Sequence, residues 1–163
     1  DPMTDSEDVL RAALGDVRID PVGLTRDDWL DLLMTHRIQP GFQVDRLTVV
    51  QDYPASQSAL ARIRADDPPV AERFECYLGA LELANGYHEL TDAHEQRQRF
   101  RRDQNMRAQR GDVAPPMDAH LLAALEHGLP QCAGVALGVD RLLMAMLGAD
   151  SIAEVLAFPF ARA

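Results

Sequence analysis

Three glutamates recur at intervals of seven within residues 72–90, where alternating apolar residues indicate β-strands: Glu75, Glu82 and Glu89. In one straight strand this odd spacing places successive members on opposite faces. A turn near Gly79 would let Glu75 and Glu82 come from neighbouring strands and converge. Two carboxylates held together repel each other unless a cation lies between them, and Mg²⁺ shared with substrate phosphates is the usual cation. The alternative, which the spacing alone favours, is that these glutamates face solvent at a sheet edge.

The third glutamate has polar neighbours that could bind an amino group. Glu89 follows Asn85 and Tyr87 closely, and a carboxylate, an amide and a phenol beside a kink at Asn85-Gly86 could hold an ammonium group by charge-assisted hydrogen bonds. The alternative is ordinary turn chemistry at Asn85-Gly86, with His88 exposed. The five histidines of the chain show no metal-binding spacing, so a zinc site is not expected.

A second cluster of candidate residues lies in the segment Gly134-Val-Ala-Leu-Gly-Val-Asp-Arg141. It lacks the Lys-Ser/Thr of a P-loop and the glycine spacing of a dinucleotide-binding turn. Small residues in a strand let a flat ligand approach the sheet. Gly138 then leads into a helix with Arg141 near its amino end, where the helix dipole disfavours a cation. A bound phosphate tail would explain this arginine, and an ion pair with Asp140 or another acid is the alternative.

The elements that must position these residues follow from apolar periodicity, capping residues and breakers. The sequence predicts a helix from Thr25 to Met34, a strand from Leu47 to Tyr53, a short helix over 56–65, a hairpin of strands 72–78 and 80–89, a helix from Asp92 to Gln109, a helix over 119–127, a strand over 135–137, a helix over 141–147 and an apolar tail over 152–160 that packs on the core. Strands and helices without a βαβ rhythm predict an α+β fold, an antiparallel β-sheet flanked by helices, in one domain.

Charge and composition exclude several classes of protein. The chain has 26 acidic and 16 basic residues and a net charge of −10, the opposite of the balance that phosphate neutralisation requires. The local basic run over 97–110 is typical of a solvated helix face. The two cysteines, Cys76 and Cys132, match no metal or redox spacing, and no stretch is long enough to span a membrane. A cytoplasmic protein without membrane or general nucleic-acid binding is therefore expected.

Two of these segments together resemble a known family. Residues 73–92 are similar to the strand pair of class II aminoacyl-tRNA synthetases of the lysyl group, and residues 134–144 look like class II motif 3. The resemblance is strongest to the lysyl-tRNA-synthetase paralogs that ligate β-lysine to elongation factor P, and it runs from about residue 9 to the end. The features that favour these paralogs are the segments 52–61, 70–74, 88–92 and 148–158. Residues 1–163 thus resemble the carboxy-terminal half of a class II catalytic domain.

The resemblance implies an ATP site that uses Mg²⁺. By its pattern, Glu75 and Glu82 hold Mg²⁺ on ATP, and Glu82 and Leu83 lie against the nucleotide. Gly138 lies under the adenine or ribose, and Arg141 clamps the γ-phosphate. Glu82 and Arg141 are therefore the candidate catalytic residues.

The resemblance also implies a substrate pocket and a reaction. Glu89, Asn85 and Tyr87 match the pocket for the distal ammonium group of lysine or β-lysine. Ala136 replaces a glycine of lysyl-tRNA synthetases, and its methyl group would reshape that pocket. The implied reaction is formation of an aminoacyl adenylate from ATP, followed by transfer to a lysine of elongation factor P.

Class II motifs 1 and 2 have no counterpart in these residues. We therefore expect a fragment, an incomplete record of a longer chain, or a split or decayed gene, and we expect the chain alone to be inactive. A homodimer would form through the missing half, and tRNA binding is not expected. Two alternatives stay open: a fragment of a true lysyl-tRNA synthetase, and a non-catalytic module that binds an amino acid or a partner protein.

Overall fold

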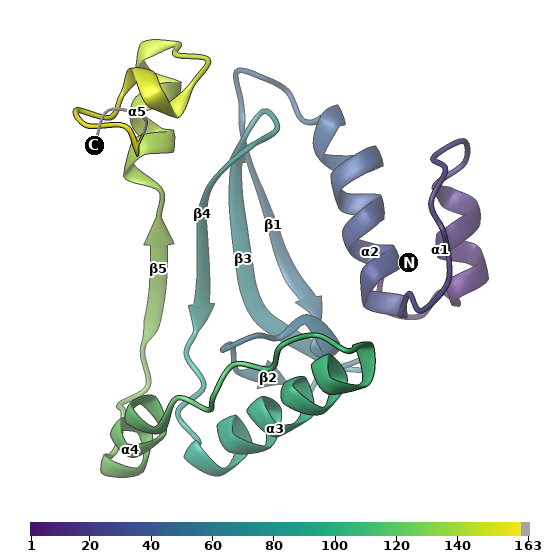
Figure 1. Cartoon of the computed structure of the whole chain (residues 1–163), viewed down its shortest axis with the longest axis vertical. Helices are drawn as coiled ribbons and strands as arrows, with labels where there is room; N and C mark the ends of the chain where they lie inside the picture. The colour runs from purple at the N-terminus through teal and green to yellow at the C-terminus, as the bar shows by residue number, and fades with distance from the viewer. Residues whose placement is uncertain (161–163) are drawn as a thin grey trace.

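The computed structural model describes residues 1–160 as five helices beside an antiparallel sheet (Figure 1). The sheet has the strand order β1–β3–β4–β5, with β2 also paired to β3. The α+β class and the antiparallel sheet are confirmed. The helices are α1 Glu7–Ala13, α2 Arg26–Leu33, α3 Ala93–Arg110, α4 Ala119–His127 and α5 Val139–Leu147, and the strands are β1 Leu47–Pro54, β2 Ile63–Arg64, β3 Val70–Leu78, β4 Leu81–His88 and β5 Ala133–Leu137.

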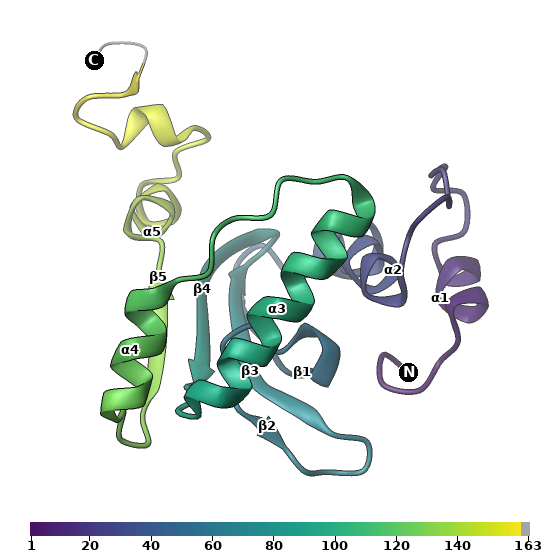
Figure 2. The ribbon, with the colours of Figure 1, turned by 60° about the horizontal axis from the view of Figure 1, so that its bottom comes forward.

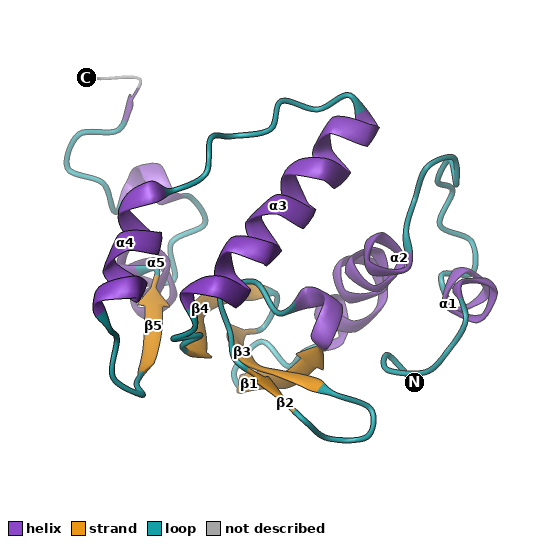
Figure 3. Ribbon diagram, turned by 90° about the horizontal axis from the view of Figure 1, so that it is seen from below, coloured by secondary structure: helices purple, strands orange, loops and turns teal. Residues whose placement is uncertain are grey.

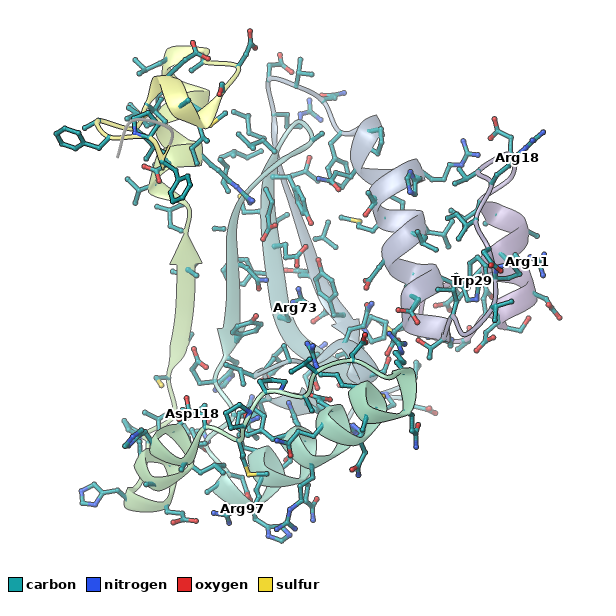
Figure 4. The ribbon with its side chains drawn as sticks, in the orientation of Figure 1. Arg11, Arg18, Trp29, Arg73, Arg97 and Asp118 are labelled. Carbon is teal, nitrogen blue, oxygen red and sulfur yellow. The ribbon has the colours of Figure 1, made fainter. Side chains whose placement is uncertain are left out.

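Side-chain caps define where three of the helices begin. Thr25 and Asp28 form a reciprocal capping box at the start of α2, as the sequence predicts, and this satisfies backbone N–H groups that have no partner inside the helix. Asp92 accepts hydrogen bonds from two backbone N–H groups at the start of α3, and Asp118, labelled in Figure 4, accepts one at the start of α4. The helix α3 ends at Gly111, whose φ of 77° is left-handed, a conformation that costs glycine little.

The small apolar core lies between α1 and α2. Leu10, Leu14 and Trp29 are 4, 2 and 5% exposed and pack together. Burial of each such side chain stabilises the pair by about 1.5–3 kcal/mol. Figure 2 shows this helix pair on the β1 side of the sheet, and Figure 3 shows α3 running from beside α4 toward α2. None of the helices formed by residues 1–160 is long and apolar enough to cross a bilayer.

Two predictions about local structure outside the β3–β4 hairpin are wrong. Residues 56–65 form no helix beyond a 3-10 turn at Ala55–Gln57, because Ala61 pairs with Glu89 as an isolated β-bridge and β2 begins at Ile63. The apolar tail over 152–160 does not pack on the core. Phe158 and Phe160 are 83 and 97% exposed, and the turn Ile152–Glu154 contacts α5 instead.

Candidate active site

An extra residue in β4 decides which side of the sheet carries the second glutamate. Cys76 pairs with Ala84, but the next residue, Tyr77, pairs with Glu82, so Leu83 is an additional residue in β4. Such a β-bulge re-aims the side chains beside it. In a regular register Glu82 would lie opposite Leu78, on the other face. The bulge brings Glu82 to the same face as Tyr77.

The predicted kink at Asn85-Gly86 is wrong, since both residues stay in register with β3. Gly86 serves close packing instead of turning the chain. A Cβ atom at Gly86 would lie 2.5 Å from the ring of Phe74 and 2.9 Å from the carbonyl oxygen of Gly134. Both distances are shorter than any ordinary van der Waals contact, so Gly86 lets β3, β4 and β5 approach one another.

One face of the sheet, which we call the site face, collects most of the candidate residues. The pairing registers place eight side chains or small residues on it: Arg73, Glu75, Tyr77, Glu82, Asn85, Tyr87, Gly134 and Ala136. Part of the opposite face is apolar and open, and its Leu47, Val49 and Val135 are 60, 55 and 62% exposed. The structure therefore brings the three predicted glutamates and motif 3 to a common surface.

Glu75 is buried in a network of hydrogen-bond donors. It is 9% exposed, and its Oε1 accepts from Arg73 Nη2 and, at 3.3 Å, from Asn85 Nδ2. Its Oε2 accepts from the hydroxyl of Tyr77. Burial, and next the hydrogen bond to Glu75, raise the pKa of Tyr77, so this hydroxyl keeps the proton it donates. Each carboxylate oxygen has two lone pairs, so Oε2 retains one for a further partner.

Glu82 is more accessible and contacts the arginine of motif 3. Arg141 Nη1 donates to the backbone oxygen of Glu82 at 2.9 Å and lies 3.5 Å from Glu82 Oε2. The side chains of Arg141 and Glu82 are 49 and 35% exposed, so both can reach a ligand. Gly138 N donates to Leu83 O at 2.8 Å, which places the amino end of α5 beside the bulge. The partner of Arg141 is thus Glu82 and not the adjacent Asp140.

The two carboxylates can share a divalent cation with a phosphate. Glu75 and Glu82 lie on adjacent strands one pleat apart, which sets their Cα atoms about 8 Å apart. Within residues 1–160 no cluster supplies three or more metal-type ligands. This donor set fits Mg²⁺, which usually takes one or two protein carboxylates and completes its octahedron with water and substrate phosphates.

The residues predicted to bind the ammonium group lie on and beside β4 and β5. Tyr87 pairs with Gly134, and Asn85 pairs with Ala136. Glu89 extends over Gly134, where an added Cβ atom would overlap Glu89 Oε1 and lie 3.3 Å from its Cδ. Within the described chain, Asn85 Oδ1 is buried and accepts no hydrogen bond. Free acceptors and carboxylates are the groups that bind ammonium, and Asn85 Oδ1 and Glu89 offer one of each, four residues apart along the chain.

His88 is not a free surface residue, in contrast to the expectation from turn chemistry. Its Nδ1 lies 3.0 Å from Glu72 Oε2 and its Nε2 lies 2.9 Å from Gln131 Oε1. Glu72 and His88 are on the face opposite the site face, and Gln131 lies two residues before β5. These contacts fasten the end of β4 to the residues that lead into β5, beside the pocket.

Sequence reasoning assigned no role to Arg73 or Tyr77, although both donate to Glu75. The signal was present: Arg73, Glu75 and Tyr77 alternate in one strand, and a period of two places them on one face. No comparable signal marks Tyr53, which contacts Arg73 from β1.

Comparison with known proteins finds relatives over the whole chain. A profile of the class II tRNA synthetases (D, K and N) matches residues 31–162. The chain is 50% identical to an elongation factor P--(R)-beta-lysine ligase of Klebsiella pneumoniae subsp. pneumoniae and 48% identical to one of Salmonella gallinarum. Both alignments cover 100% of this chain and 51% of the relative. The chain therefore spans about half the length of these curated relatives.

Proposed function

Because the chain belongs to the class II tRNA synthetase family of the D, K and N type, we propose that the whole protein of which it is part is an ATP-dependent ligase. Its substrate is lysine or β-lysine, and its acceptor is a lysine of elongation factor P. The names of the relatives, which are ligases of (R)-β-lysine and elongation factor P, support this substrate and this acceptor.

The observation that carries the proposal is the separation of charge along β4 and β5. Glu89 marks an anionic pocket at one end, over Gly134, and Arg141 stands at the other end beside Glu82. Asn85, whose Oδ1 accepts no hydrogen bond among the described residues, lies between the two ends, opposite Ala136. The pocket suits the ammonium group of the amino acid, while Arg141 suits the triphosphate. The substrate carboxylate would then lie between these two ends, near the α-phosphate of ATP.

Two steps follow from this placement. A carboxylate oxygen of the amino acid bonds to the α-phosphorus as the bond to pyrophosphate breaks, which gives an aminoacyl adenylate. The ε-amine of the acceptor lysine then attacks the acyl carbon, loses a proton and expels AMP. Arg141 orients the triphosphate and stabilises the negative charge that moves to the leaving group, and Glu89 holds the amino acid in register. Mg²⁺, held by Glu82 and Glu75, would supply neutralisation of phosphate charge.

The activity is proposed for the whole protein and not for these residues alone. The open apolar face and the unpaired outer edge of β5, within residues 1–160, support the need for further packing partners. We propose a cytoplasmic homodimer that does not depend on tRNA. A chain of net charge −10 lacks the basic surface that general nucleic-acid binding needs.

ATP–pyrophosphate exchange by the whole protein tests the proposal, with α-lysine and β-lysine compared side by side. Exchange that prefers β-lysine, together with incorporation of labelled β-lysine into elongation factor P in a second reaction, is the expected result. Preference for α-lysine with transfer to tRNA would identify a lysyl-tRNA synthetase instead. A folded protein that exchanges with neither amino acid would refute the ligase and favour a non-catalytic binding module.

A further inference from the structure

Arg73 lies behind Glu75 on the site face and has three different contacts. Its Nη2 donates to Glu75 Oε1, and its Nη1 donates to the backbone oxygen of Gln57 at 3.2 Å. The guanidinium carbon lies 4.4 Å from the centre of the Tyr53 ring, a cation–π distance. The side chain is only 18% exposed. Arg73 is therefore fixed from three sides, and Figure 4 labels it among the strands of the sheet.

A second bulge places the aromatic ring over this arginine. The register of β1 shifts between Gln51 and Tyr53, and Asp52 between them has a left-handed φ of 60°. The shift turns Tyr53 to the face of Arg73. Arg64 Nη1 donates to Asp52 Oδ1 at 3.2 Å. A non-glycine residue in this conformation is uncommon, and bulges often re-aim a side chain next to a site.

A chain of hydrogen bonds links Arg73 to helix α2. Gln57, whose carbonyl accepts from Arg73, donates from its side-chain Nε2 to Asp31 Oδ1 at 2.8 Å. The neighbouring Ser56 donates to Asp27 Oδ1 at 2.7 Å. Both aspartates are on α2. The loop that holds Arg73 is thus fastened to α2 by two side-chain hydrogen bonds.

We propose that Arg73 is a positioning residue that orients the Glu75 carboxylate toward the nucleotide-bound cation, and that α2 holds Arg73 in place through Gln57. This inference rests on the proposed function, because it concerns the same Mg²⁺–ATP site. Arg73 and Asn85 donate to Oε1 and Tyr77 donates to Oε2, and the Tyr53 hydroxyl, whose pKa is raised by burial and next by Glu75, also faces this carboxylate. The donors therefore decide which lone pair of Glu75 faces the cation.

The positive charge of Arg73 has a second effect. Two carboxylates beside a triphosphate repel each other and the ligand, and a buried cation on one of them reduces that repulsion. Loss of a partner behind a metal-binding side chain typically lowers metal affinity by about 10- to 100-fold. The variant Arg73→Lys would keep the positive charge but lose the planar guanidinium group, which contacts Glu75 and Gln57 at the same time.

The test compares Arg73→Lys with Arg97→Lys in the whole protein. Arg97 also contacts a carboxylate, that of Glu126, but it joins α3 to α4, is more exposed at 34% and lies outside the site. The first measurement is the Mg²⁺ concentration that gives half-maximal ATP–pyrophosphate exchange. The second, which needs no turnover, is the Mg²⁺ concentration that gives half of the ATP-induced rise in melting temperature.

We expect Arg73→Lys to raise both midpoints by about 10- to 100-fold, with exchange largely restored at saturating Mg²⁺. Arg97→Lys should leave both midpoints within about twofold. Gln57→Ala keeps the carbonyl that Arg73 uses but loses the link to Asp31, so it should raise the midpoints by a smaller factor. Unchanged midpoints in Arg73→Lys, with only a lower melting temperature, would make Arg73 merely structural and overturn the inference. Failure of the ligase proposal would show in the unmodified protein, which would then give no Mg²⁺-dependent response to ATP.

Discussion

The glycine beneath Glu89 offers the sharpest test of the ammonium pocket. Gly134 does not have a left-handed φ, yet a Cβ atom there would overlap Glu89 Oε1. Alanine therefore fits the backbone but must displace the carboxylate. Loss of one charge-assisted hydrogen bond costs about 1.5–3 kcal/mol, which is about 10- to 150-fold in binding. We expect Gly134→Ala to raise the KM for lysine or β-lysine by that factor.

The same variant should leave ATP binding nearly unchanged. Gly134 and Gly138 are four residues apart in an extended segment, which places the amino-acid end about 13 Å from the phosphate end. ATP–pyrophosphate exchange at varied amino acid and at varied ATP separates the two KM values. Gly41→Ala is the matched control, because a Cβ there meets nothing within 4 Å. A KM for the amino acid within twofold of the unmodified protein would refute the proposed position of Glu89, and equal changes in both KM values would point to a distorted sheet.

Three further predictions concern neighbouring positions. Ala136→Gly removes the methyl group beside Asn85, and one methyl group discriminates between substrates by about 1–3 kcal/mol. The ratio of kcat/KM for α-lysine to kcat/KM for β-lysine should therefore rise. An unchanged ratio would mean that Ala136 does not determine specificity. Gly86→Ala forces a carbon to within 2.5 Å of the Phe74 ring, and overpacking typically costs about 1–3 kcal/mol. The midpoint of urea unfolding should therefore move to a lower urea concentration. A loss of less than about 0.5 kcal/mol in the free energy of unfolding would contradict the close packing at Gly86. Burial raises the pKa of Asp31, so the folded protein binds this proton more tightly than the unfolded chain does. The protein therefore loses stability as pH rises from the pKa of Asp31 in the unfolded chain through its raised pKa in the folded protein. Asp31→Asn, which still accepts from Gln57, should therefore be more stable than the unmodified protein at pH 7 and lose that advantage near pH 4, as melting at the two pH values would show.

The parts of the fold that the sequence predicts well depend on local chemistry. The capping box of Thr25 and Asp28 and the cap at Asp92 mark helix starts, and both were confirmed. The hairpin of β3 and β4 follows from period-two alternation around Gly79, whose φ is 53°. Such signals are contained within a few neighbouring residues, so one sequence is enough to read them.

The parts that sequence reasoning misses depend on contacts between distant residues. Residues 56–65 contain good helix formers, but pairing of Ala61 with Glu89 overrides that preference. Asn85-Gly86 has turn chemistry, but Gly86 is required by the Phe74 ring, while the actual bulge lies at Leu83. No local signal marks Leu83, because the register depends on how β3 and β4 pair along their whole length. The joint position of Glu75 and Glu82 could therefore not be derived from spacing alone.

The last strand of the sheet, β5, is attached along one edge only, which affects the stability of the site. Among the described strands β5 is hydrogen-bonded to β4 only, and α5, which carries Arg141, contains no buried residue. Segments with few buried contacts open locally at a small free-energy cost. The backbone amides of β5 should therefore exchange with solvent faster than those of β3 in the isolated chain. A triphosphate held between Arg141 and Glu82 would link α5 to β4. Nucleotide binding would therefore stabilise the part of the fold that opens most easily.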